Sequence, residues 1–292
     1  MRTAVITVVH GRTAHLRRQL QGLATSTLRP DMHVVVALGD PDVAKVVDEL
    51  GAPAITLDRN ASHPLPLAMG RNVGAAAAAR NGAELLVFLD VDCIPGAELL
   101  DRYHTVAGVT EHEDAILNGP VTYLSPPPPG GYVISAVRSK PDPHRGRPAP
   151  PDGTVVAATD YALFWSLSFA VRVPTWQRIG GFCELYRGYG GEDTDFGQCA
   201  AASHVPMRWV GGAHAFHQYH AVADPPVDHL DDILRNATIF HRRWGWWPME
   251  NWLSSFADKG LIHRHTDGRP VRTASQGHHP PASTGIHVVA DG

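Results

Sequence analysis

Two aspartates at the end of an apolar run are the first residues with recognisable chemistry. The segment "ELLVFLDVDCIPG" places Asp90 and Asp92 one residue apart, directly after a run with the composition of a buried strand. Two carboxylates that close repel each other, and apolar surroundings strengthen the repulsion. A divalent cation removes the conflict, and hard oxygen ligands suit Mg²⁺ or Mn²⁺. The pattern indicates a metal site. The alternative is an aspartate that ends the strand and a second one that is solvated, without a metal.

A second stretch, "GGFCELYRGYGGEDTDFG", holds six glycines and four carboxylates in residues 180–197. Glycine lets the backbone approach a bulky polar ligand closely. Glu192, Asp193 and Asp195 fall on what reads as the first turn of a helix, where the helix dipole favours acidic residues. An ordinary acidic first turn explains these acids but not the "GYGG" directly before them. The stretch therefore predicts a ligand site.

Histidines form the third cluster. The segment "HAFHQYH" contains His214, His217 and His220. Neutral imidazole is a common ligand of Mn²⁺ or Zn²⁺, so one of the three can complete a site begun by Asp90 and Asp92. For any single one of them, a surface loop in a chain with 18 histidines is the alternative.

The first ninety residues alternate between strand-like and helix-like segments. β-branched apolar runs occupy residues 3–9, 33–40, 54–58 and 84–90, and helical spacing occupies residues 13–27, 41–51 and 68–82. This alternation predicts an α/β fold with a parallel sheet and helices on both faces. Ligands of such sheets bind beyond the carboxyl ends of the strands, where Asp40, Asp58 and Asp90 fall.

Composition excludes several classes of protein. The chain has 292 residues, 43% hydrophobic and 18% charged, with a formal net charge of −4, which is typical of a globular protein and gives no nucleic-acid footprint. Three widely spaced cysteines form neither a disulfide framework nor a CxxC site. The sequence contains no run of about 18 apolar residues, so it predicts no transmembrane segment. We therefore expect a cytoplasmic protein, and peripheral binding at the inner membrane face is compatible with these features.

The domain boundaries follow from composition. Residues 1–262 read as one domain, with a proline-rich loop at 125–153 that contains nine prolines. This loop is either a disordered insertion or a mobile lid beside the site. A tryptophan-rich helical segment, broken near Pro248, precedes a tail at 263–292 that we expect to be disordered.

Taken in order, "DVD", "SLSFAVRVPTWQRIGGFCELYRGYGGEDTDFG" and "HAFHQYH" resemble a known family. They are similar to GT-A glycosyltransferases, in particular the family 2-like enzymes with the C-terminal galactosyl/N-acetylgalactosaminyl-transferase motif. The resemblance runs from about residue 5 to about residue 261. It implies a Rossmann-like GT-A fold with a mixed, mostly parallel sheet, a donor-binding half at about 1–120 and an acceptor half at about 155–262.

The resemblance also implies roles for individual residues. The metal, Mn²⁺ or Mg²⁺, would be held by Asp92 and Asp90 with His217, and His214 is the reserve. The implied donor-binding residues are His10, Gly11, Arg12, Asp40, Arg71, Asn72, Asp90, Val91 and Asp92. The implied acceptor-binding residues are Trp165, Tyr189, Gly190, Gly191 and Glu192. The implied catalytic pair is Asp193 as the base, with Glu192 as a positioning group.

The implied activity is metal-dependent transfer of a hexose from a UDP- or GDP-linked sugar to a hydroxyl of a saccharide acceptor. "VVHGR" and "ALGDPD" depart from the family pattern at the base-recognition end, which leaves the nucleotide open. The residues are compatible with inversion or retention, including a retaining mannosyltransferase that uses GDP-mannose in oligosaccharide or polysaccharide elongation. The same residues also permit a non-catalytic sugar-nucleotide-binding module or a metal-dependent hydrolase. Homo-oligomerisation is left open.

Overall fold

The computed structural model describes residues 1–49, 54–57, 64–221 and 223–273. Its body is an eight-stranded mixed sheet with strand order β3-β2-β1-β4-β9-β6-β10-β8. The strands are β1 (Thr3–Val9), β2 (Met32–Leu38), β3 (Ala54–Leu57), β4 (Leu85–Leu89), β6 (Ile116–Asn118), β8 (Val155–Ala157), β9 (Ser168–Arg172) and β10 (Met207–Val210). The first four strands and the β6–β10 pair are parallel, whereas β9 runs antiparallel to both β4 and β6. The predicted α/β fold with a mixed, mostly parallel sheet is confirmed. Asp58, which directly follows β3 in the sequence, lies outside the described residues.

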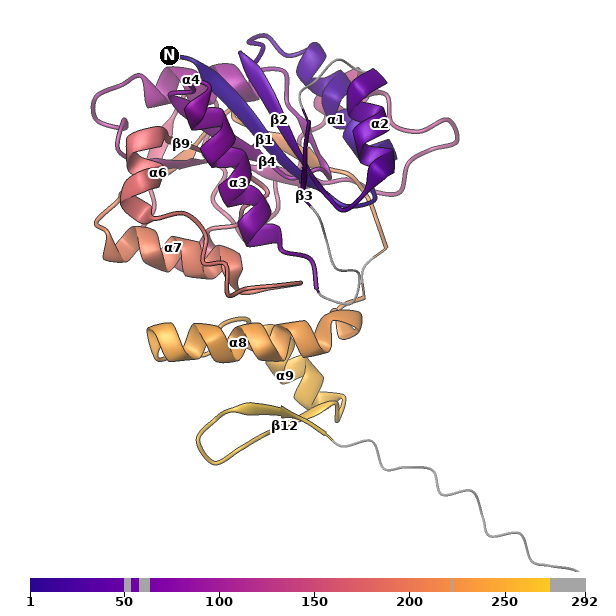
Figure 1. Cartoon of the computed structure of the whole chain (residues 1–292), viewed down its shortest axis with the longest axis vertical. Coiled ribbons are helices and arrows are strands. Elements are labelled where there is room, and N and C mark those ends of the chain that lie inside the picture. The colour runs from indigo at the N-terminus through magenta and orange to yellow at the C-terminus, as the bar shows by residue number, and fades with distance from the viewer. Residues whose placement is uncertain (50–53, 58–63, 222, 274–292) are drawn as a thin grey trace, which may run out of the picture.

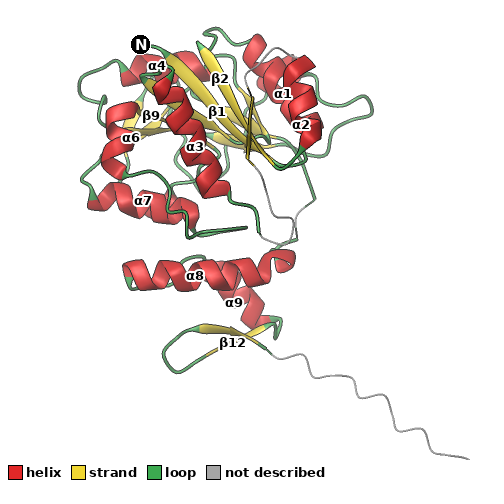
Figure 2. Cartoon of the chain, in the orientation of Figure 1, coloured by secondary structure: helices red, strands yellow, loops and turns green. Residues whose placement is uncertain are grey.

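Helices cover both faces of this sheet (Figures 1 and 2). Residues alternate between the two faces along β1, so Ile6 packs in the same core as α3, α6 and α7, while Val5 and Val9 face α4, α1 and α2. Alanine-rich α3 packs closely on β1, because a Cβ on Gly74 would lie only 2.6 Å from Ile6 Cγ2. The helices are α1 (Thr13–Ala24), α2 (Pro41–Glu49), α3 (Leu67–Arg80), α4 (Leu99–Ala107), α6 (Val173–Ile179) and α7 (Glu192–Ala202).

A second sheet of three short strands positions the candidate site. It has the order β5-β11-β7 and consists of β5 (Cys93–Pro95), β11 (Ala215–His217) and β7 (Val121–Tyr123). These strands follow β4, β10 and β6 of the large sheet along the chain. The residues that connect the two sheets are therefore gathered at one edge, and Asp90 and Asp92 belong to the connection from β4 to β5.

The C-terminal part forms a layer beside the α/β body, drawn in orange and yellow in Figure 1. It consists of α8 (Leu230–Trp244), α9 (Glu250–Asp258) and a hairpin of β12 (Ile262–Arg264) with β13 (Pro270–Arg272). The break between α8 and α9 at Pro248 agrees with the sequence. The hairpin corrects the predicted start of the tail at 263, because residues 262–264 pair with residues 270–272. Residues 274–292 lie outside the described part of the chain. No described helix has the length and apolarity needed to cross a membrane.

The proline-rich loop packs against the body and includes the short helix α5 (Ile134–Arg138). The Arg138 guanidinium donates to the carbonyls of Pro95 (3.0 Å) and Gly22 (2.8 Å), and the Asp142 N–H donates to Thr122 Oγ1 (2.8 Å). The loop is thus joined to α1, β5 and β7. The segment is packed and not the disordered insertion that was one of the two alternatives; its role as a lid stays a prediction. Short 3₁₀ turns lie at Tyr161–Leu163 and Val227–His229, and the three cysteines are free thiols.

Candidate metal and transfer site

The backbone around Asp90 and Asp92 is held by hydrogen bonds on both sides. The Asp90 N–H donates to Leu167 O (3.0 Å), and its carbonyl accepts from Cys93 N (2.8 Å) and from buried Gln19 Nε2 (2.7 Å). These bonds leave the two carboxylates to other partners. Asp90 and Asp92, with Val91 between them, then face two different sets of side chains.

Asp92 lies in a cluster with two histidines. One oxygen or nitrogen atom from each of Asp92, His217 and His220 lies within 4.8 Å of the other two. The pairing of β11 with β5 and a hydrogen bond from Gln218 N to Asp92 O (2.7 Å) bring the histidines there. Burial lowers the pKa of His217 to about 4, so its imidazole is neutral at pH 7. A carboxylate with two imidazoles suits Mn²⁺ better than Mg²⁺, which prefers oxygen ligands only.

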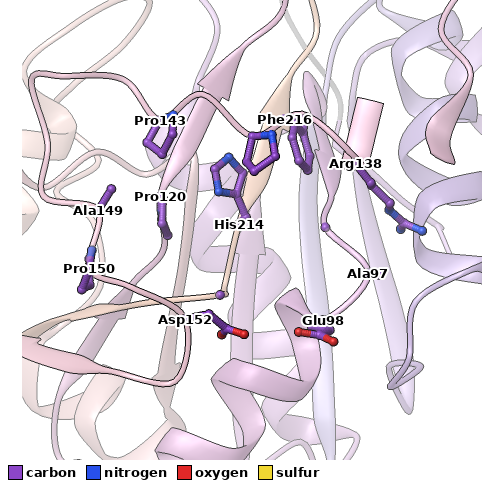
Figure 3. A pocket seen from close by; sticks show the side chains of 13 residues that line it. Ala97, Glu98, Pro120, Arg138, Pro143, Ala149, Pro150, Asp152, His214 and Phe216 are labelled. Atoms are coloured by element: carbon purple, nitrogen blue, oxygen red, sulfur yellow. The ribbon is translucent and has the colours of Figure 1, made fainter. Parts of the chain in front are cut away.

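His214, the reserve ligand, lies elsewhere. Its Nε2 is 2.7 Å from Thr122 Oγ1, and it lines a pocket of about 390 Å³ together with Pro120 and Phe216 (Figure 3). The second histidine of the cluster is His220 and not the reserve ligand His214. In the sequence, His217 and His220 are three residues apart, but so are His214 and His217 in "HAFH". Spacing alone therefore does not distinguish the two pairs.

Asp90 faces Arg71 instead of the cluster. Arg71 is 5% exposed, and its guanidinium lies 3.2 Å from Asp90 Oδ1 and 3.4 Å from Glu192 Oε1. Burial raises the pKa of Asp90 to about 6, against the opposing effect of Arg71. Burial and the negative charge of Asp193 raise the pKa of Glu192 to about 7. Arg71 therefore joins the end of β4 to the start of α7, and its positive charge compensates the carboxylates of Asp90 and Glu192.

The remaining residues of the expected donor site are placed as follows. The Gly11 N–H donates to Asp40 Oδ2 (2.6 Å), which fixes the turn after β1, and His10 Nδ1 lies 2.9 Å from Leu38 O. From this turn Arg12 Nη1 reaches Asp92 Oδ1 at 3.1 Å. Asn72 instead holds the segment after α6, because its amide exchanges two hydrogen bonds of 2.9 Å with the backbone of Phe182.

The glycine-rich motif packs against α8. The amide of buried Asn236 donates to three carbonyls of this loop, those of Arg187 (3.0 Å), Tyr189 (3.2 Å) and Gly190 (2.8 Å). Gly191, with φ 91°, leads into α7, which begins at Glu192. The ring of Tyr189 stacks on His229, with ring centroids 4.6 Å apart. These contacts position the first turn of α7.

The carboxylates of α7 have separate roles. Asp193 Oδ2 accepts from Ser166 N (2.9 Å), beside Trp165, while its Oδ1 is buried without a hydrogen-bond partner among the described residues. Asp195 is fully buried and accepts from Arg243 Nε (2.6 Å) and Trp244 Nε1 (2.7 Å) of α8. Asp195 therefore holds the C-terminal layer, and Glu192 and Asp193 face the site.

One family model matches a segment of the chain. Residues 157–221 match the family model described as the N-terminal domain of galactosyltransferase, a segment that contains β9, α7 and β11. No curated protein sequence matches the chain.

Solved structures resemble the chain at low sequence identity. S. aureus TarS 1-349 superposes with a TM-score of 0.54 at 16% identity, covering 82% of this chain and 65% of that one. TarS 1-349 in complex with UDP-GlcNAc gives 0.54 at 13% identity, with coverages of 88% and 80%. GalNAc-T7 with UDP, GalNAc and Mn²⁺ gives 0.52 at 14% identity, with coverages of 75% and 43%. The chain thus spans less than two thirds of the first of these relatives.

The fold is that of the GT-A glycosyltransferases TarS and GalNAc-T7, and residues 157–221 match the galactosyltransferase family model.

Proposed function

We propose that the protein transfers a hexose from a UDP-linked sugar to a hydroxyl group of a saccharide acceptor, with Mn²⁺ as the cofactor. The observation that carries this proposal is the cluster of Asp92, His217 and His220 beside the Arg71 pairs with Asp90 and Glu192. UDP in the TarS and GalNAc-T7 structures, and Mn²⁺ in the latter, support the choice of nucleotide and metal.

The cluster would hold the metal, which when bound neutralises the diphosphate and stabilises the charge that builds there. Arg12 contacts Asp92 and Arg71 contacts Asp90, so both add positive charge beside these two aspartates. The positive charge of these side chains favours binding of the diphosphate and its departure as an anion.

Asp193 is the proposed base. Its Oδ2 is fixed by Ser166 N, and its Oδ1, which has no hydrogen-bond partner among the residues that the structure describes, accepts the proton of the acceptor hydroxyl. As the hydroxyl oxygen bonds to the anomeric carbon, the bond from that carbon to the phosphate oxygen breaks, and its electron pair leaves with the UDP. Glu192 stays paired with Arg71 and positions this end of α7. Trp165, beside Asp193, can offer an aromatic surface to sugar C–H groups, whereas the ring of Tyr189 already stacks on His229 and Trp252.

The test is thermal stability of the protein with UDP- and GDP-linked sugars, with and without Mn²⁺. A ligand of the native state raises the melting temperature with the logarithm of its concentration. We expect a Mn²⁺-dependent shift with UDP-linked sugars. A shift with GDP-mannose alone would move the proposal to a mannosyltransferase, and no shift with any of them would overturn it. Formation of a glycoside product distinguishes a transferase from a binding module.

A further inference from the structure

Gln19 is a polar residue on the buried face of α1. Its side chain is fully buried, as is that of Leu16 on the same face. Burying an amide costs free energy unless its polar atoms are hydrogen-bonded. Those of Gln19 are bonded, because its Nε2 donates to Asp90 O (2.7 Å) and to Cys93 O (3.2 Å). Gln19 therefore joins α1 to both ends of the turn that carries Asp92.

The direction of each hydrogen bond around Gln19 follows from the groups involved. Because the carbonyls of Asp90 and Cys93 can only accept, the amide nitrogen faces them, and Oε1 on the other side can only accept. The Thr7 hydroxyl therefore donates to Gln19 Oε1 (2.9 Å). This uses the one hydrogen of that hydroxyl, so His33 Nε2, 3.0 Å from Thr7 Oγ1, is the donor in their contact. A chain of donors thus runs from His33 of β2 through Thr7 of β1 and Gln19 of α1 to the turn.

The same turn is held from the histidine side by a second buried glutamine. Gln218 directly follows His217, and its side chain is fully buried. Its backbone N–H donates to Asp92 O (2.7 Å), and its Nε2 donates to His15 O of α1 (3.1 Å). The helix α1 is therefore hydrogen-bonded both to the segment of Asp92 and to the segment of the histidines.

We propose that Gln19 is a positioning residue of the metal site. Its hydrogen bonds fix the backbone on both sides of Asp92 and so direct the carboxylate towards His217 and His220. A turn that is fixed in advance lowers the cost of binding, because the carboxylate need not be ordered when the metal arrives. The inference rests on the proposed role of this cluster as a Mn²⁺ site.

The test uses two substitutions that leave the cluster itself unchanged. Gln19→Met keeps the length of the side chain without a hydrogen-bond donor, and Thr7→Val keeps Gln19 but removes the hydroxyl that orients it. The readout is the dissociation constant for Mn²⁺ in the presence of UDP, measured by electron paramagnetic resonance. We expect it to rise about tenfold to a hundredfold in Gln19→Met, the range for groups that orient metal ligands. Thr7→Val should raise it about twofold to tenfold, the contribution of one hydrogen bond, and Thr7→Ser should restore it.

Thr3→Val is the matched control for Thr7→Val. Thr3 is buried on the same face of β1, and its hydroxyl has no hydrogen-bond partner among the described residues. The substitution makes the same exchange of hydroxyl for methyl without affecting the turn, so the affinity for Mn²⁺ should stay. Equal weakening in Thr3→Val and Thr7→Val would show an effect of strand packing and would contradict the inference.

The spectrum of the bound ion gives a second readout, which reports ligand geometry and not the stability of the fold. At saturating Mn²⁺ it should change in Gln19→Met and stay the same in Thr3→Val. Unchanged affinity and an unchanged spectrum in Gln19→Met would overturn the inference. If Gln19→Met does not fold, Thr7→Val and Thr7→Ser decide, and equal Mn²⁺ affinity in these two would overturn it. Failure of the unmutated protein to bind Mn²⁺ with UDP would instead refute the proposed function, and the inference with it.

Discussion

The two groups of carboxylates at the candidate site are compensated in different ways. Asp92 keeps 16% of its side chain exposed and faces two histidines at the edge of the small sheet. Glu192, at the start of α7, pairs with buried Arg71, which also contacts Asp90. Around Asp92 the neutral imidazole of His217 adds no charge, and the arginine that contacts it, Arg12, keeps 34% of its side chain exposed; Glu192 instead pairs with an arginine that is buried. We infer from this contrast that the histidine end binds the metal and that the arginine end serves proton transfer.

The largest expected effect is that of Asp92→Asn. Loss of the charge of the one carboxylate in the cluster should lower kcat/KM for Mn²⁺-dependent UDP release by about a thousandfold, comparable with the loss of a strong electrostatic group in a transition state. Steady-state kinetics on a UDP-linked sugar measures it. Asp42→Asn is the matched control, because Asp42 is exposed and pairs with Lys45. Full activity in Asp92→Asn would remove the cluster from the mechanism.

At the arginine end, Asp193→Asn should lower turnover by about a hundredfold or more, since a positioned base contributes at least that much. The asparagine keeps the hydrogen bond from Ser166 N but cannot accept the proton. The Mn²⁺-dependent rise in melting temperature with UDP should stay. An equal loss of UDP binding and turnover would place Asp193 in the donor site instead.

Asp195 lies two residues from Asp193 but should affect stability. Asp195→Asn removes the charge that Arg243 contacts and weakens the bonds to Trp244 and Tyr186. We expect a loss of about 2–4 kcal/mol in the free energy of unfolding, less than for a fully buried pair because Arg243 is 35% exposed. Urea denaturation measures it. If Asp195→Asn has normal stability but low turnover per folded molecule, the assignment of Asp195 to stability and of Asp193 to proton transfer is contradicted.

The smallest effect separates the histidines. His220→Ala should weaken Mn²⁺ binding about tenfold to a hundredfold, the range for groups that tune a metal site, and His214→Ala should leave it unchanged. Isothermal titration with Mn²⁺ in the presence of UDP measures both. The reverse ranking of the two variants would restore His214 as the ligand.

The sequence predicted features that depend on local pattern. The apolar runs that become β1 to β4 and the acids at the start of α7 are each visible within a few residues. The antiparallel insertion of β9 between β4 and β6 depends on pairing between residues about eighty positions apart, such as Phe88 with Phe169. Such long-range pairing leaves no signal in a short window.

The strand register of the small sheet determines which second histidine lies beside Asp92, and the sequence alone did not predict it. His217 pairs with Cys93 in the small sheet, and the chain then returns so that His220 reaches Asp92. His214, with the same spacing from His217, is left on the other side of the strand beside Thr122. Arg147 lies over the rings of two tryptophans, a position that a loop with nine prolines and no periodicity does not predict.

The affinity of the protein for Mn²⁺ in the presence of UDP, measured by electron paramagnetic resonance of the free ion, tests the metal assignment without relying on turnover. We predict one Mn²⁺ site that needs UDP, is lost in Asp92→Asn and is kept in Asp42→Asn. Equal Mn²⁺ affinity in the unmutated protein and in Asp92→Asn would contradict the assignment of the cluster as the metal site of a glycosyltransferase.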